Sequence, residues 1–230
     1  MSRVVALVQA RMGSSRFPGK MLAPLGGAPI LEWVLTRVKG SKYLDQVVLA
    51  TSDLSRDDEL VGLAKRVGVS VYRGSEVDVL GRFSAAAKFY NADFIVRVCA
   101  DNPFIDPVEI DRLIKFYKNN PCDYACNHQS RLGNKYADGF GAEILSEPLL
   151  RYLSDTALEL TYREHVTSYL WDNVKRFNLQ SVESPPDLSY PELRFDIDTP
   201  EDYEGMQRLI LAGVNINTSA TKIVSLARSI

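Results

Sequence analysis

Cysteine is scarce in this chain of 230 residues, which contains only Cys99, Cys122 and Cys126. A small, odd number argues against a disulfide framework, and no second Cys or His pair completes a zinc site around Cys122 and Cys126. No apolar run approaches membrane-spanning length, and the N-terminal apolar segment is too short, and too soon followed by Arg11, for a signal peptide. These absences predict a reduced, cytoplasmic protein.

The chain also lacks a large excess of charge of either sign, with a net charge of −2 and a pI of about 5.8. Such a protein has no global attraction for nucleic acid or for an anionic membrane, so we expect neither as a partner. Any anionic ligand must be held by a local basic cluster. The hydrophobic content of 46% and the charged content of 24% are typical of an ordinary globular domain.

Short apolar runs alternate with segments of helical spacing, which favours an α/β fold with a mostly parallel central sheet and helices on both faces. We predict one domain over 1–230, with an irregular insertion at about 123–185. The predicted strands are 4–8, 46–50, 69–72, 94–98, 177–182 and 193–197. The predicted helices are 30–38, 55–66, 78–90, 107–117, 147–153, 162–171, one beginning at Pro200, and a weak one after Gly213.

The loop after the first predicted strand, QARMGSSRFPGK, concentrates positive charge. Arg11, Arg16 and Lys20 lie within ten positions, and small residues such as Gly13 and Ser14 let backbone N–H groups approach a phosphate. The glycine spacing matches neither a P-loop nor a dinucleotide fingerprint. The spacing alone leaves two readings open, a polyphosphate site or a solvated turn with incidental charges.

Two aspartates follow predicted strands. Asp101 ends the strand in RVCADNPFIDP, and Asp198 ends the strand in LRFDIDTPEDY. Carboxylates at the carboxyl ends of strands, beside a triphosphate, are the oxygen ligands that Mg²⁺ prefers. Each has a structural alternative, since Asp198 before Pro200 fits a helix N-cap and Asp101 fits an Asx-type turn.

The loop and the segment after it resemble the N-terminal signature of sugar-activating cytidylyltransferases, a family that includes CMP-sialic acid and CMP-Kdo synthetases. The resemblance implies a Rossmann-like nucleotide-diphospho-sugar transferase fold and a loop that wraps the triphosphate of CTP. It places phosphate contacts at Arg11, Ser14, Arg16 and Lys20, and cytosine recognition at the backbone around Ala10. The family pattern is matched at Arg11, Gly13, Ser14, Arg16, Pro18, Gly19, Lys20, Leu25, Gly26 and Pro29.

Later segments resemble the branch of this family that contains the spore-coat polysaccharide biosynthesis protein F. In YRGSEVDVLGRF, the resemblance implies base or ribose contacts at Arg73, Ser75 and Asp78, although Ser75 or Asp78 also fits a helix N-cap. The resemblance also implies contacts to the acceptor sugar from two further segments, KYADGFGAEIL and YREHVTSYLW. The residues expected to make these contacts are Tyr136, Asp138, Glu143, Arg163, Glu164 and His165.

The resemblance implies transfer of CMP from CTP to an acidic sugar or related polyol, with release of pyrophosphate, by a homodimer. It implies that Asp101 and Asp198 hold the catalytic Mg²⁺. It also implies that Arg11, Arg16 and Lys20 are catalytic because they stabilise the negative charge of the departing pyrophosphate. His165 lies inside a predicted helix and is not read as a general base. The competing functions are transfer from another nucleotide, glycosyl transfer from a nucleotide sugar, and nucleotide binding without catalysis.

Overall fold

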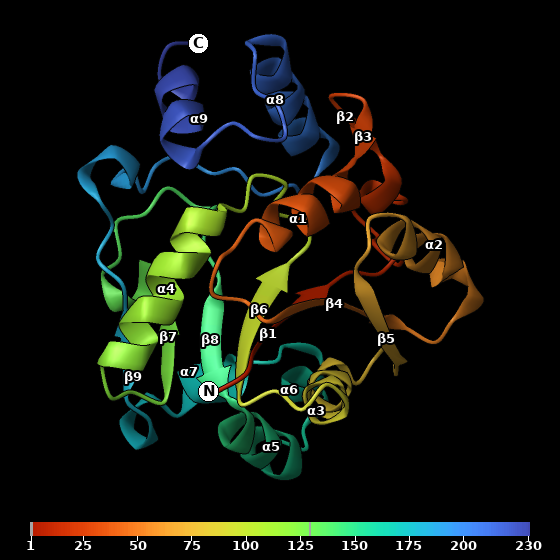
Figure 1. Cartoon of the computed structure of the whole chain (residues 1–230), viewed down its shortest axis with the longest axis vertical. Helices are drawn as coiled ribbons and strands as arrows, with labels where there is room; N and C mark the ends of the chain where they lie inside the picture. Colours follow the sequence, from red (N-terminus) through yellow and green to blue (C-terminus); the bar gives the residue numbers. More distant parts are fainter. Residues whose placement is uncertain (1, 129) are drawn as a thin grey trace.

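A seven-stranded sheet forms the centre of the computed structural model, which describes residues 2–128 and 130–230 (Figure 1). Its strands are β1 (Val4–Gln9), β4 (Gln46–Ser52), β5 (Ser70–Gly74), β6 (Phe94–Cys99), β7 (Tyr124–Cys126), β8 (Glu143–Ser146) and β9 (Leu179–Ser181). They follow the order β5-β4-β1-β6-β8-β7-β9. β8 runs antiparallel to β6 and β7, and the other neighbouring pairs are parallel. The predicted mostly parallel sheet is confirmed.

Helices cover both faces of this sheet, as the sequence predicted. The helices that pack on the first core are α1 (Ile30–Lys39), α2 (Asp58–Arg66), α4 (Pro107–Asn119), α8 (Pro200–Leu211) and α9 (Ala220–Ala227). Those on the second core are α3 (Val79–Phe89), α5 (Glu147–Thr156), α6 (Leu160–Glu164) and α7 (Ser168–Asp172). The remaining short elements are a hairpin of β2 (Pro24–Leu25) and β3 (Ala28–Pro29), and the 3₁₀ turns η1 (Lys20–Leu22), η2 (Ser55–Asp57), η3 (Ser130–Leu132), η4 (Val174–Arg176) and η5 (Pro186–Leu188).

The first strand shows why its sequence is apolar without interruption. Val4, Ala6 and Val8 pack in the first core, whereas Val5 and Leu7 pack in the second. Successive side chains of a strand point to opposite faces, so a strand with a core on each side needs apolar residues at every position. The carboxyl end of β1 therefore lies between the two cores, and the cationic loop (residues 9–20) begins there.

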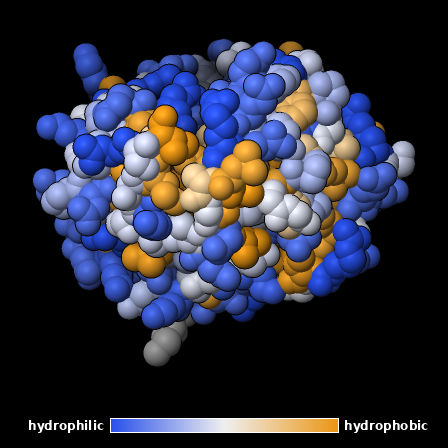
Figure 2. Space-filling model, turned by 90° about the horizontal axis from the view of Figure 1, so that it is seen from above, coloured by the Kyte–Doolittle hydropathy of each residue, from blue (hydrophilic) through white to orange (hydrophobic). Residues whose placement is uncertain are grey.

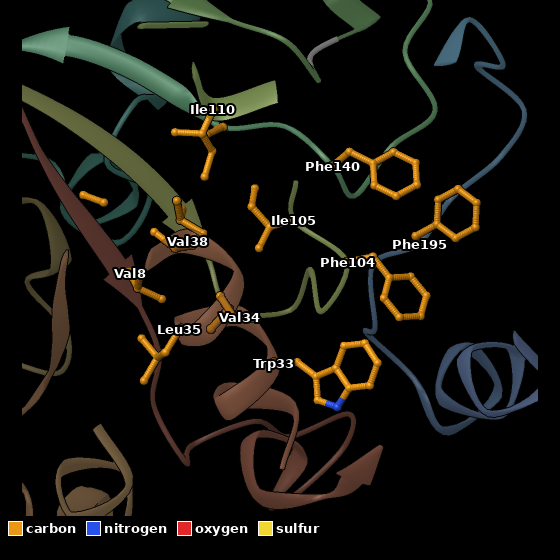
Figure 3. Close-up of a cluster of buried hydrophobic side chains, with 14 of the residues drawn as sticks. Val8, Trp33, Val34, Leu35, Val38, Phe104, Ile105, Ile110, Phe140 and Phe195 are labelled. Atoms are coloured by element: carbon orange, nitrogen blue, oxygen red, sulfur yellow. The ribbon is translucent and has the colours of Figure 1, made fainter. Parts of the chain in front are cut away.

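A row of aromatic rings joins two distant segments on the first core (Figure 3). The ring centroids of Trp33 and Phe104 are 5.7 Å apart, those of Phe104 and Phe195 are 6.2 Å apart, and those of Phe195 and Phe140 are 4.8 Å apart. These contacts fix the segment just before Asp198 against the segment just after β6. Aromatic packing, rather than strand pairing, thus holds the two predicted acidic segments in place.

Two predicted elements are wrong. The helix expected over 162–171 is two short helices, α6 and α7, because Val166 and Thr167 are β-branched and Val166 turns into the second core. The strand expected over 193–197 is absent from the described chain, apart from an isolated bridge between Asp138 and Arg194. Its alternating pattern reflects the burial of Phe195 and Ile197 and not pairing in the sheet.

The face that carries α8 and α9 shows apolar residues scattered among polar ones (Figure 2). Leu211 and Ile230 lie beside a shallow groove on this face, and both are largely exposed. Within the described residues, no helix combines the length and the apolarity that a bilayer crossing requires. Segment 123–185 adds β7, β8 and β9 to the common sheet, and its assignment as an insertion within one domain stays a prediction.

Candidate active site

A cavity of about 410 Å³ lies where the loop after β1, the end of β6 and the start of α8 meet. It collects predicted residues from four separate parts of the chain, so segments up to about 190 positions apart share one space. The predicted residues that line it are Ala10, Arg11, Gly13, Ser14, Arg16, Lys20, Asp101, Glu164, His165 and Asp198. A solvated turn with incidental charges would not require the loop to share one cavity with Asp101 and Asp198.

The cationic loop is anchored by a buried aspartate that the sequence analysis missed. Asp57 accepts a hydrogen bond of 2.8 Å from the backbone N–H of Met12, and it also accepts from the hydroxyls of Thr51 and Ser52. Burial raises the pKa of Asp57, but the hydrogen bonds from Ser52, Met12 and Thr51 outweigh burial, and the net pKa is lowered. An acidic residue shortly after the end of a buried strand is the signal that sequence reasoning passed over.

Replacing Asp57 with alanine is expected to destabilise the fold by about 2–4 kcal/mol. Four donors lose their acceptor: the hydroxyls of Thr51 and Ser52 and the backbone N–H groups of Met12 and Ser52. A group whose pKa is depressed in the fold stabilises it above the unfolded pKa, so this difference shrinks as the pH falls through the acidic range. Urea denaturation at neutral pH and at pH about 3 measures both effects. Asp53→Ala, at an exposed position in the same turn, is the matched control; equal stability of the two variants would contradict the anchoring role.

The cationic loop meets one of the predicted carboxylates directly. The Oδ2 atom of Asp198 lies 3.1 Å from Nη1 of Arg16, and its Oδ1 atom lies 3.6 Å from Nζ of Lys20. Lys20 is buried and also donates to the carbonyl of Ile197. The helix-cap reading of Asp198 is wrong, because Thr199 caps α8. Asp198 therefore lines the cavity and does not cap the helix.

Asp101 occupies a position that disfavours its own charge. Burial raises the pKa of this carboxyl, and Asp198 and Asp196 raise it further, while Lys20 opposes them. The backbone carbonyl of Asp101 accepts a 2.8 Å hydrogen bond from the N–H of Ile197, which ties the two acidic segments together. Asp196 is neutralised separately by Arg194, at 2.7 Å. Acidic groups gathered in this way favour a bound cation.

The donor set suits a magnesium ion that arrives with a nucleotide. Asp101 and Asp198 offer hard carboxylate oxygens, which match this metal. Across residues 2–128 and 130–230, no three acidic, histidine or cysteine side chains are grouped so as to hold an ion by themselves. Magnesium in such sites uses one or two carboxylates together with substrate phosphates and water. The two aspartates fit that role.

The loop between α6 and α7 closes another side of the cavity. Glu164 and His165 line it, and Oε1 of Glu164 lies 3.1 Å from Nη2 of Arg11. His165 is outside the helix, with φ −111° and ψ 92°, so the expectation that it sits within a helix is wrong. The break between α6 and α7, which the sequence did not predict, thus places Glu164 and His165 beside the cationic loop.

Comparison with known proteins bears directly on this arrangement. The model of the cytidylyltransferase family matches residues 5–224, nearly the whole chain. This chain belongs to the cytidylyltransferase family. The cationic loop and both acidic segments lie within the matched range.

This cytidylyltransferase is 36% identical to the spore coat polysaccharide biosynthesis protein SpsF of Bacillus subtilis, over 98% of this chain and 94% of that protein. A solved cytidylyltransferase structure from Leptospira borgpetersenii superposes with a TM-score of 0.92 at 33% identity, covering 100% of this chain and 95% of that one. The 8-amino-3,8-dideoxy-manno-octulosonate cytidylyltransferase of Shewanella frigidimarina is 33% identical over 53% of this chain and half of its own length. The resemblance stated from sequence is confirmed.

Several predicted nucleotide contacts of this cytidylyltransferase do not line the cavity. Arg73 donates to the backbone carbonyls of Ser52, at the end of β4, and of Leu54, and its guanidinium pairs with Asp58 at 2.6 Å. Asp78 caps α3 and pairs with Arg163 at 2.6 Å, while Oγ of Ser75 accepts from the N–H of Asp78. The N-cap reading of Asp78 is confirmed. A role in nucleotide or sugar binding stays a prediction for these residues.

Four predicted acceptor contacts also lie off the cavity, and one of them is Arg163, which pairs with Asp78. The hydroxyl of Tyr136 donates to Glu109 at 2.7 Å within the first core. Asp138 accepts from the neighbouring backbone N–H, and burial raises its pKa. Glu143 is almost fully buried and pairs with Arg97 at 2.9 Å. Their direct contact with an acceptor stays a prediction, but Glu143 reaches the site through Arg97.

The cavity floor contains residues that the sequence analysis did not select. Gln9, Arg97 and Cys99 line it from the ends of β1 and β6. Gln9 and Cys99 lie opposite each other in the pairing of β1 with β6. Both side chains are on the face of the sheet that carries the second core. The signal was a single arginine within the otherwise apolar strand FIVRVC, where burial of a charge demands a partner or a ligand.

Proposed function

We propose that this cytidylyltransferase transfers CMP from CTP to an acidic sugar or a related polyol and releases pyrophosphate, as a step in the biosynthesis of a surface polysaccharide. The observation that carries the proposal is the approach of Arg16 and Lys20 of the cationic loop to Asp198, with Asp101 beside them. The similarity to SpsF supports the polysaccharide context, and the similarity to the octulosonate enzyme supports an acidic sugar. Homodimer formation and a cytoplasmic location remain predictions.

The reaction is an in-line displacement at the α-phosphorus of CTP. A hydroxyl oxygen of the acceptor forms the new P–O bond, its proton leaves to solvent, and the bond to the pyrophosphate oxygen breaks. Arg11, Arg16 and Lys20 hold the charge that accumulates on the departing pyrophosphate. Asp101 and Asp198 would hold Mg²⁺, which supplies neutralisation of phosphate charge when bound. Positioning and electrostatics supply the catalysis, so no protein base is required.

The ion pairs of the site are expected to exchange partners when the substrate binds. Arg16 and Lys20 pair with Asp198, and Arg11 pairs with Glu164. A triphosphate takes over the cations, and this releases carboxylates that then favour a metal ion. Binding of CTP and binding of the metal therefore strengthen each other, and this coupling is reciprocal.

Pyrophosphate release, measured with each nucleoside triphosphate and with a panel of sugar acids and polyols, tests the proposed function. We expect release with CTP and Mg²⁺ that depends on the acceptor. Release without a preference among nucleotides would contradict cytidylyl transfer. Consumption of a nucleotide sugar instead would favour glycosyl transfer, and binding of CTP with no turnover under any condition would favour a non-catalytic role.

A further inference from the structure

A polar patch forms the floor of the cavity on the face of the sheet that carries the second core. Val96 and Val98 of β6 point into the first core, so Arg97 between them points to the opposite face. In the register of the sheet, Arg97 stands beside Glu143 of β8 on one side and Leu7 of β1 on the other. Glu164 at the end of α6 and His165 just after it also line this cavity.

Arg97 has hydrogen-bonding capacity that the protein does not use. Its side chain is 14% exposed, and Nη1 lies 2.9 Å from Oε2 of Glu143. Nη2 has a long contact of 3.5 Å with Oε1 of Gln9, and the buried Nε has no hydrogen-bond partner among the residues described. Buried donors without partners are rare in native proteins, and a guanidinium that keeps its charge makes the deficit costly. Nη1 and Nη2 each carry two N–H groups and make one of these contacts each, so a bound anion would pair with the remaining N–H groups of the guanidinium.

Glu143 fixes one edge of this guanidinium. The carboxylate is 1% exposed. Nε2 of His128 lies 3.6 Å from its Oε1, whereas Arg97 pairs with its Oε2. Arg97 lowers the pKa of Glu143, against the effect of burial, so Glu143 stays ionised behind the cavity wall. Glu143 is thus a positioning residue, and the planar fork of Arg97 is held ready for a second carboxylate.

The anion that reaches Arg97 differs from the triphosphate. The phosphate-binding cations Arg11, Arg16 and Lys20 all come from the loop above the strand ends, whereas Arg97 comes from within β6 on the floor. Resting on the proposed function, we infer that Arg97 binds the carboxylate of the acceptor. Arg97 thereby determines that this enzyme selects sugar acids over neutral acceptors.

Paired acceptors test this inference. The full-length enzyme is assayed with CTP, 3-deoxy-manno-octulosonate and other 3-deoxy-2-ulosonic acids, each beside its methyl ester. The wild type is expected to prefer acid over ester by roughly 100-fold or more in kcat/KM, because a buried donor rejects an analogue that cannot pair with it. Arg97→Met is expected to lower kcat/KM for the acid about 100-fold, with little change for the ester and an unchanged KM for CTP.

A second variant guards against misfolding. Arg97→Met alone leaves Glu143 buried without its partner, which destabilises proteins, so Arg97→Met with Glu143→Gln removes the pair together. A folded double variant that keeps the acid preference overturns the inference and leaves CMP transfer intact. A large rise in KM for CTP with the acid preference kept also overturns it, because Arg97 would then serve the phosphates. A wild type that uses a neutral polyol and no acid overturns the inference and leaves CMP transfer standing, whereas one that uses neither overturns the proposed function as well.

Discussion

Asp101→Asn is expected to abolish CMP transfer and, at the same time, to raise the stability of the ligand-free protein. Burial and the nearby carboxylates raise the pKa of Asp101, so the fold disfavours its charged form. A carboxyl whose pKa is raised by folding costs stability once the pH rises above its ordinary value. The asparagine removes that cost but also removes a carboxylate proposed to hold Mg²⁺.

The two effects have different sizes and readouts. Loss of a metal ligand removes several kcal/mol of transition-state stabilisation, so kcat should fall by roughly three orders of magnitude. In EDTA without CTP, the Tm should rise by about 2–4 °C at neutral pH, the shift that about 1 kcal/mol gives in a chain of this size. The gap in Tm should close in acid, where Asp101 is protonated in the folded wild type.

Asp155→Asn is the matched control, because Asp155 is exposed on α5 and away from the cavity. It should leave kcat and Tm unchanged. An Asp101→Asn protein that melts below the wild type at neutral pH would contradict the electrostatic description of Asp101. One that retains full turnover would remove Asp101 from the reaction centre.

Lys20→Met should have the opposite effect on stability and a similar effect on activity. Lys20 is the buried cation beside Asp198, and it opposes the acidic charge around Asp101. Its loss leaves the carbonyl of Ile197 without this donor and Asp198 with Arg16 as its remaining ion-pair partner, which should destabilise the fold by about 1–3 kcal/mol. The value of kcat/KM for CTP should fall by about three orders of magnitude, since a triphosphate contact and a charge balance are lost together.

Combining the two substitutions separates charge balance from catalysis. The double variant Lys20→Met, Asp101→Asn should recover much of the stability lost in Lys20→Met, because the carboxyl that repels its neighbours is gone. Its activity should stay at the level of the single variants. Urea denaturation measures the coupling, and Lys65→Met, at an exposed position on α2, is the control. Additive stabilities would show that Lys20 and Asp101 do not interact.

Local pattern was enough to predict most of the fold. The unbroken apolar run of β1 gave a strand buried on both faces, and the spacing of three and four in 30–38 gave α1. These elements are determined by residues close in sequence, and the period of their apolar residues indicates which of their faces are buried in the core. The carboxyl ends of parallel strands share one edge, so the proximity of Asp101 to the cationic loop could also be expected.

Features that depend on long-range packing escaped prediction. The break at Val166 and Thr167 follows from a buried site in the second core. The extended segment before Asp198 is held by rings from two other segments, those of Phe104 and Phe140. Asp57 and Arg97 gain their roles from partners that only the folded chain supplies. A charge within an apolar strand was visible in the sequence, but its orientation toward the cavity depends on strand register.

Anomalous diffraction from crystals grown with CTP and Mn²⁺ tests most directly whether the cationic loop and the two aspartates surround one nucleotide–metal complex. We expect a manganese peak bonded to carboxylate oxygens of both Asp101 and Asp198 and to phosphate oxygens of CTP, with Arg16 and Lys20 turned from Asp198 to the triphosphate. A metal held by the phosphates alone, or a nucleotide bound away from residues 10–20, would contradict this site.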